Sequence, residues 1–385
     1  MQTDKHGLNP AAKLVRQLFE TDKLKALPTR NGYGDGLVLA GADPRVVVLC
    51  ADLTESTRSL AFKQAFPDRF VQMGVSEQSM ASIAAGMAMA GKIPFISSYA
   101  CFSPGRNWEQ IRTTVALNDV NVKIAGAHSG VSVGPDGATH QMIEDIAIMR
   151  VMPNMKVLVP CDAIETKKAT LALAKDPGPG YLRFAREKSP VFTTENTPFK
   201  IGRAELFRFG SDATIIAADP LLYEALVAAQ MLSKHHLEVR VIDCASIKPL
   251  DVKMIVAAAR ETGAIVTVEE AQAAGGLGGV IAETLSAFHP VPIERVGMPD
   301  RFGESGEPPE LLEGFGLTAP YIALAVERAV KRKVGVKVAT EPEYVTAGRE
   351  KLAELKEKII TEALSRTPKK WGGKKPDDSL KSRKK

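Results

Sequence analysis

Short apolar runs alternate with amphipathic segments along the first half of the chain. Six runs rich in β-branched residues have the length of buried strands, and the segments between them carry the wider apolar spacing of helices. Regular alternation of strand and helix is typical of a mainly parallel sheet with helices on both faces. The predicted strands are residues 45–50, 69–74, 93–98, 121–127, 155–160 and 180–185, and the predicted helices include 77–90, 106–117 and 141–152.

A polar, proline-bearing stretch at residues 187–202 interrupts this pattern and predicts an interdomain linker. The alternation then restarts, which predicts a second, smaller α/β domain. Its predicted strands are residues 212–218, 237–244, 264–270 and 293–298, and its predicted helices are 221–233, 251–260, 275–288 and 319–333.

The two ends of the chain differ from these domains. Leu14, Val15, Leu18 and Phe19 predict a short helical arm at the N-terminus, and residues 343–364 predict one amphipathic helix. The expected organisation is an arm at 1–27, domains at 28–192 and 193–335, and an extension at 336–385 that ends in a disordered basic tail.

The positive charge of the chain is concentrated in that tail. The formal net charge is +5, and residues 367–385 hold eight Lys or Arg and two Asp, a net of +6. The rest of the chain therefore carries −1. No aromatic-rich basic face supports nucleic-acid binding, so nucleic acid is not an expected partner of the folded body.

No apolar run is long enough to span a bilayer, and the first twenty residues lack the apolar core of a signal peptide. The four cysteines have no metal-ligand spacing, and three lie in or beside apolar runs, which favours buried thiols in a reducing cytoplasm. We expect no metal site of this chain's own. The cysteines are Cys50, Cys101, Cys161 and Cys244.

Two glycine-rich stretches have unfavourable contexts for phosphate binding. Gly34-Asp35-Gly36 lies in a helical stretch, and the chain has no Asn-Asn pair to close a thiamine diphosphate motif. The segment at 275–279 lacks the GxGxxG spacing of a dinucleotide loop, so we interpret it as a closely packed helix start.

Glu77 begins the small, apolar helix of residues 77–90. A carboxylate in the first turn of a helix can simply complement the helix dipole. If the helix starts in a cleft, the same group can hold or exchange a proton instead. The residue alone does not decide between these two roles.

Other candidate residues follow the ends of predicted strands, where α/β folds bind ligands. Tyr99 and Phe102 follow one strand, and these rings are either core residues or a flat wall for a heteroaromatic ring. His128 ends the next strand, and a Gly/Pro loop carries Asp136 and His140. Two histidines and an aspartate on such a loop are either structural or part of a site.

At these residues the chain resembles the C-terminal half of the transketolase family. The matching segments are FVQMGVSEQSMASIAAGMAMAGKIPF, SSYACF and GVSVGPDGATHQ, and the resemblance extends over about residues 28–333. It implies two consecutive three-layer α/β/α domains: a mainly parallel pyrimidine-binding domain and then a smaller mixed-sheet C-terminal domain. It also implies a thiamine diphosphate-dependent transketolase of the pentose phosphate pathway, which moves a two-carbon ketol unit from a ketose phosphate to an aldose phosphate.

The resemblance assigns roles residue by residue. Glu77 would hydrogen-bond the ring nitrogen of the cofactor's aminopyrimidine and promote loss of the thiazolium proton, and His140 would join it in catalysis. Phe102 and Tyr99 would stack on the pyrimidine, and Asp52 would line the cofactor cleft. The sugar phosphate would be held by Arg30, Ser56, His128 and Arg186, and the ketose hydroxyls would be read by Asp136 and His140.

The diphosphate-binding half of the family is absent from this sequence. The resemblance therefore implies a separate N-terminal, diphosphate-binding subunit that holds most of the Mg²⁺ or Ca²⁺, in an α2β2 assembly. Ala271 departs from the family, which commonly has a histidine there.

Three alternatives remain. They are the β subunit of a 2-oxo-acid dehydrogenase, a deoxyxylulose-phosphate-synthase-like enzyme, and an inactive interaction protein whose basic tail binds nucleic acid. The phosphate-holding set argues against the first. The last would require an inert site despite Glu77 and its neighbours.

Overall fold

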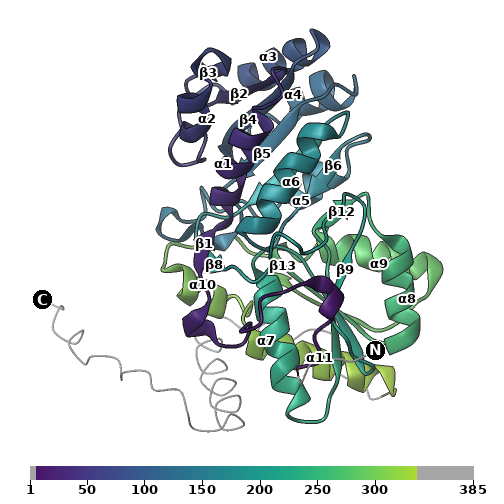
Figure 1. The fold of residues 1–385 in the computed structure, drawn as a ribbon. Helices are drawn as coiled ribbons and strands as arrows, with labels where there is room; N and C mark the ends of the chain where they lie inside the picture. Colours follow the sequence, from purple (N-terminus) through teal and green to yellow (C-terminus); the bar gives the residue numbers. More distant parts are fainter. Residues whose placement is uncertain (1–5, 336–385) are drawn as a thin grey trace, which may run out of the picture. The chain divides into compact units, whose positions relative to one another are not determined.

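The computed structural model describes residues 6–335, and the first domain is built on a seven-stranded sheet of strand order β12-β6-β7-β5-β4-β2-β3 (Figure 1). All six predicted strands of the first half are present and parallel, which confirms the predicted sheet. They are β2 (Val46–Cys50), β3 (Phe70–Gln72), β4 (Ile93–Tyr99), β5 (Lys123–Ala127), β6 (Lys156–Leu158) and β7 (Gly180–Phe184).

Helices cover both faces of this sheet because its strands are apolar on both sides. In β2, Val46 and Val48 pack with α1 and α6, whereas Val47 and Leu49 pack with α3 and α5. Gly32 brings α1 close to α6, since a Cβ there would lie 1.8 Å from the carbonyl oxygen of Ala163. The helices are α1 (Thr29–Ala40), α2 (Leu60–Ala65), α3 (Glu77–Met89), α4 (Trp108–Gln110) with a π-helical continuation (Ile111–Ala116), α5 (Asp145–Arg150) and α6 (Ala163–Lys175).

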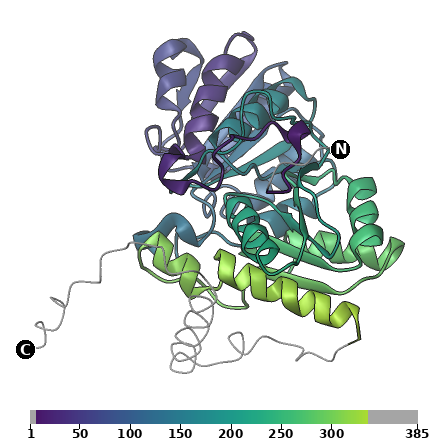
Figure 2. The same cartoon turned by 60° about the horizontal axis from the view of Figure 1, so that its bottom comes forward.

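The second domain has a five-stranded mixed sheet of order β14-β13-β10-β11-β9, in which β9 is antiparallel. This confirms the predicted fold class. One face packs with α7 and α11, which runs along the sheet in yellow-green in Figure 2, and the other face packs with α8 and α9. The elements are β9 (Glu205–Arg208), β10 (Ala213–Ala217), α7 (Leu221–Ser233), β11 (Val239–Asp243), α8 (Val252–Thr262), β13 (Ile265–Gln272), α9 (Leu277–Phe288), β14 (Ile293–Met298), α10 (Pro308–Gly314) and α11 (Ala319–Lys333).

The two domains share structure in a way that the sequence pattern did not predict. A strand of the second domain, β12 (Ser246–Lys248), adds antiparallel to the edge of the first sheet. One hydrophobic cluster also contains residues of both domains, such as Met149 and Ile281. None of the helices within residues 6–335 is long and apolar enough to cross a membrane.

The N-terminal arm differs from the predicted helical arm. Its helical structure within residues 6–27 is limited to two 3-10 turns, Pro10–Ala12 and Thr21–Lys23, and its end enters strand β1 (Ala26–Pro28), which pairs with β8 (Lys188–Pro190) of the linker. Its apolar residues pack on the second domain instead of along a helix, and Leu18 is buried there. The linker is held firmly, since the buried carboxylate of Asp162 accepts hydrogen bonds from the amides of Phe192 and Thr193. The predicted helix at 343–364 and the basic tail lie outside the described residues.

A buried arginine connects the domains. The guanidinium of Arg183, on β7, donates to Asp145 at 2.9 Å and to Asp219 of the second domain at 3.2 Å. It also donates to the carbonyl of Glu270 at 2.7 Å. Removing one partner from such a buried network leaves an uncompensated charge, so its groups must be retained together.

A second buried polar cluster joins α6 to the end of β11. Cys161, Glu165 and Asp243 are buried. The Cys161 sulfur and one carboxylate oxygen from each acid lie within 4.8 Å of one another. Burial, followed by the nearby Glu165, raises the pKa of Asp243 well above its usual range. Burial likewise raises the pKa of Glu165. Because burial favours the protonated form of each acid, we infer that one proton is held between Glu165 and Asp243 at the domain boundary.

This shared proton predicts a pH-dependent effect of Asp243→Asn. An acid whose pKa is raised on folding stabilises the protein below the pKa of the unfolded chain, and this stabilisation is lost as the pH rises through the folded pKa. The asparagine amide can still donate to Glu165 and never ionises. We expect a higher free energy of unfolding than wild type, by about 1 kcal/mol or more at pH 8 and less at pH 5.

Chemical denaturation at both pH values, in the full chain, measures this difference. The exposed Asp300 provides a control, and Asp300→Asn should change the free energy of unfolding little. Equal effects of Asp243→Asn at pH 5 and pH 8 would contradict the shared proton.

Candidate functional site

The parallel register of the first sheet brings the predicted residues to one edge. Tyr99 pairs with Ala127 and Ala127 with Phe184 at the carboxyl ends of β4, β5 and β7. His128 and Arg186 therefore leave the sheet beside Tyr99. The start of α1 reaches the same edge, because Arg30 donates its backbone N–H to the carbonyl of Ala185.

Four of the predicted rings form one cluster. The Tyr99 and His128 rings stack with centroids 4.0 Å apart, and Tyr99 stacks with Phe102 at 6.1 Å. His140 meets Phe102 edge-on at 5.5 Å, which places the loop of residues 130–141 against these rings. Tyr99 and Phe102 are only partly buried, so flat aromatic surface is accessible at the site.

Glu77 lies buried beside this cluster at the first position of α3, with 1 % of its surface exposed. Its Oε1 accepts from Ser98 Oγ at 3.0 Å, and its Oε2 accepts from Arg106 Nη1 at 3.0 Å. The Arg106 guanidinium also lies over the Phe102 ring, 4.7 Å from its centroid. Arg106 is half exposed, so this cation can be displaced by a ligand without breaking the core.

A buried amide supports the helix start that carries Glu77. Asn107 Nδ2 donates to the carbonyl of Glu77 and to Ser103 Oγ, at 3.0 and 3.1 Å. Asn107 Oδ1 is buried and has no hydrogen-bond partner within residues 6–335. An unpaired buried acceptor of this kind is a place for a donor from a ligand or water.

Cationic groups gather on the other side of the rings. Arg30 Nη1 donates to the carbonyl of Ser56 at 3.0 Å and lies 3.4 Å from His128 Nε2. Burial and the adjacent Arg30 lower the pKa of His128 to about 3, so its imidazole is neutral and can accept from Arg30. Arg186 donates to the carbonyl of Val133 and lies 3.7 Å from Asp136. This group is suited to an anion.

Two of the predicted residues have their described contacts with groups outside the ring cluster. Asp52 is exposed after β2 and exchanges hydrogen bonds with Gln72. Ser56 contributes its backbone carbonyl to Arg30, and its side chain is only half-buried. The other predicted residues, Glu77, Tyr99, Phe102, His128, Arg30, Asp136, His140 and Arg186, are joined by the contacts above.

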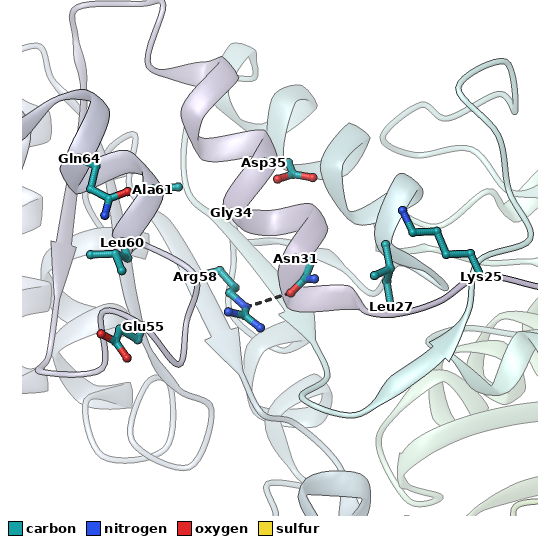
Figure 3. A pocket seen from close by; sticks show the side chains of 10 residues that line it. All are labelled: Lys25, Leu27, Asn31, Gly34, Asp35, Glu55, Arg58, Leu60, Ala61 and Gln64. Atoms are coloured by element: carbon teal, nitrogen blue, oxygen red, sulfur yellow. Dashed lines mark hydrogen bonds between the residues drawn. The ribbon is translucent and has the colours of Figure 1, made fainter.

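Sequence reasoning missed Arg58. Its position two residues after Ser56, which was predicted to hold the sugar phosphate, could have indicated it. Arg58 has a left-handed φ of 63°, and its Nε donates to Asn31 Oδ1 at 2.9 Å (Figure 3). Burial lowers the pKa of Arg30, and the positive charges of Arg58 and Arg186 lower it further. Asn31 and Arg58 line a pocket of about 750 Å³ between α1 and α2. Arg106 was also missed, four residues after Phe102.

The arrangement combines three chemical capacities. A buried carboxylate can hold or exchange a proton, partly exposed rings can stack on a flat heterocycle, and two or three arginines can bind an anionic group. Asp136 and His140 lie on one loop between the rings and Arg186, where they can contact hydroxyl groups.

Comparison with known proteins gives consistent matches over both domains. Residues 25–191 match the family model of the transketolase pyrimidine binding domain, and residues 202–322 match that of the transketolase C-terminal domain. A putative transketolase C-terminal section from Methanocaldococcus jannaschii is 41% identical over 79% of this chain and 96% of its own length. A 6-deoxy-6-sulfo-D-fructose transketolase subunit from Clostridium sp. is 38% identical over 83% of this chain and 99% of its own.

A solved structure described as a split gene transketolase, inactive beta4 tetramer, is similar in fold and sequence. Its TM-score is 0.74 at 42% identity, and the match covers 80% of this chain and 100% of that one.

Proposed function

Because this chain belongs to the transketolase family, we propose that it is the C-terminal subunit of a two-chain transketolase. The complex would move a two-carbon ketol unit from a ketose phosphate to an aldose phosphate, with sugars of the pentose phosphate pathway as the substrates. The observation that carries the proposal is the placement of buried Glu77 beside the Tyr99–Phe102 stack, with Arg30 and Arg186 beyond it.

The family implies dependence on thiamine diphosphate, and the residues present fit the pyrimidine half of that cofactor. When bound, the cofactor supplies a carbon nucleophile that carries the two-carbon unit. Glu77 would hold a proton at its carboxylate for the ring nitrogen of the pyrimidine. Tyr99 and Phe102 would orient the ring, and Arg106 would leave Glu77 when the ring enters.

The arginines favour a phosphorylated substrate over an unphosphorylated 2-oxo acid. Arg30 and Arg186 flank the neutral His128, and Arg58 adds a third positive charge nearby. A phosphate here would receive charge-assisted hydrogen bonds from groups that are already held in place. Asp136 and His140 would contact the hydroxyl groups of the ketose. The Clostridium relative is named for a 6-deoxy-6-sulfo sugar, whose anionic group is a sulfonate instead of a phosphate.

The second subunit is part of the proposal. It would bind the diphosphate and most of the Mg²⁺ or Ca²⁺, and two copies of each chain would form an α2β2 complex. Exposed apolar side chains on and beside α3, namely Val75, Ile83 and Met89, support an interface on this helix. The four cysteines are free thiols, which supports a cytoplasmic location.

We expect Arg30→Ala and Arg186→Ala to impair the use of phosphorylated substrates more than the use of unphosphorylated ones. Loss of a charge-assisted contact should lower kcat/KM about tenfold to a hundredfold for ketose phosphates and much less for the unphosphorylated ketoses. Steady-state kinetics of the two-chain complex with both substrate types measures this. Arg45→Ala, which removes an exposed pair with Asp43, serves as the control. Equal losses for the two substrate types would favour a structural role for these arginines.

We also expect the purified chain to be inactive without the second subunit. Thiamine diphosphate must be held at both ends, and this chain supplies only the pyrimidine end. The assay contains the cofactor, Mg²⁺, a ketose phosphate and an aldose phosphate, with and without the diphosphate-binding subunit. Ketol transfer by the single chain, with no other polypeptide detected by mass spectrometry, would refute the two-chain proposal.

A further inference from the structure

The loop that carries Asp136 belongs to the first domain but is contacted by residues of the second domain. Its residues Val131–Asp136 form a 3-10 turn broken at Gly134, which has a φ of 82°. Val131 to Gly134 are buried, whereas Asp136 is exposed toward the site. Short turns of this kind have few internal hydrogen bonds, so their position depends on contacts from outside.

The second domain provides a buried contact at the start of the loop. Glu270 Oε1 accepts the backbone N–H of Ser132 at 2.6 Å, and both residues are buried. The fit is close: a Cβ on Gly130 would lie 2.3 Å from Glu270 Oε1.

The backbone of Glu270 is itself fixed. Its N–H donates to Asp219 at 2.7 Å, and its carbonyl accepts from Arg183 at 2.7 Å. It lies where the pairing of β13 with β14 shifts register between Val268 and Gln272, so its side chain leaves the regular alternation of the strand.

A second contact comes from the last residue of the loop. Gln141 Nε2 donates to the carbonyls of Val131 and Gly134 within the loop and to the carbonyl of Glu304 in the second domain, at 3.2, 3.1 and 2.9 Å. Pro308 and Ser305 of the second domain also lie against the loop glycines.

We infer that the second domain positions the substrate loop, with Glu270 as a positioning residue that holds Ser132 and thereby the site of Asp136 and His140. Glu270 contacts no predicted substrate-binding side chain directly and acts through the loop backbone. This inference rests on the proposed function only for the identity of the substrate. The contact between Glu270 and the loop stands without it.

The test compares Glu270→Ala, Glu270→Gln and Glu269→Ala in the full chain. Glutamine keeps an oxygen acceptor for Ser132 and should behave like wild type. Glu269 is an equally buried neighbour that caps α9 through the amides of Leu277 and Gly278 instead of touching the loop, so Glu269→Ala controls for loss of a buried carboxylate.

Hydrogen–deuterium exchange of the peptide covering residues 130–137 reports loop positioning without any substrate. Glu270→Ala should speed its exchange by about tenfold or more, the expected result of losing one buried hydrogen bond. Glu269→Ala should leave it unchanged. Exchange in Glu270→Ala that matches Glu269→Ala would overturn the inference.

The kinetic readout uses the two-chain complex. Glu270→Ala should raise KM for the ketose phosphate about tenfold or more, with restoration by Glu270→Gln. If the complex transfers no ketol unit in any form, the proposed function fails while the exchange result still decides the positioning role. If Glu270→Ala does not fold, Glu270→Asp replaces it: the shorter side chain withdraws the acceptor from the Ser132 amide and should speed exchange in the same peptide, and unchanged exchange there would overturn the inference.

Discussion

Arg183 is the residue on which the arrangement of the two domains depends. Its guanidinium, buried between the sheets, is neutralised by Asp145 from the first domain and by Asp219 from the second. Without Arg183 the two carboxylates keep hydrogen bonds from Tyr181, Leu221 and Glu270 but lose this buried cation, so separating the domains there breaks a buried ion pair. The same guanidinium fixes the backbone of Glu270, and through Glu270 the ionic centre is connected to the loop that carries Asp136.

This connection relates one edge of a parallel sheet to the half-site that we propose. Strand register brings Tyr99 and His128 together, the start of α3 places Glu77 beside them, and the start of α1 adds Arg30. The opposite half, which would grip the diphosphate and metal, belongs in our proposal to another subunit.

The sequence predicted most of the fold, because apolar strands such as Val46–Cys50 and periodic helices such as α7 carry strong local signals. It also predicted most of the residues that gather at the sheet edge. The prediction failed where contacts between residues distant in sequence determine the structure. β12 adds to the sheet of the other domain, and the N-terminal arm packs without forming its predicted helix. Arg106, Arg58 and Glu270 were missed because their partners are far away in sequence or lie in backbone groups, which no periodicity reveals.

The central claim is that Glu77 supplies the proton chemistry at the pyrimidine end of thiamine diphosphate. Exchange of the cofactor's thiazolium C2 proton, followed by NMR in the two-chain complex without sugar, tests it most directly, with Asp300→Asn as a control for an exposed acid outside the site. The account predicts fast exchange in wild type and in Asp300→Asn. In Glu77→Gln, with the cofactor still bound, it predicts exchange near the rate of free cofactor. A wild-type rate in Glu77→Gln would contradict it.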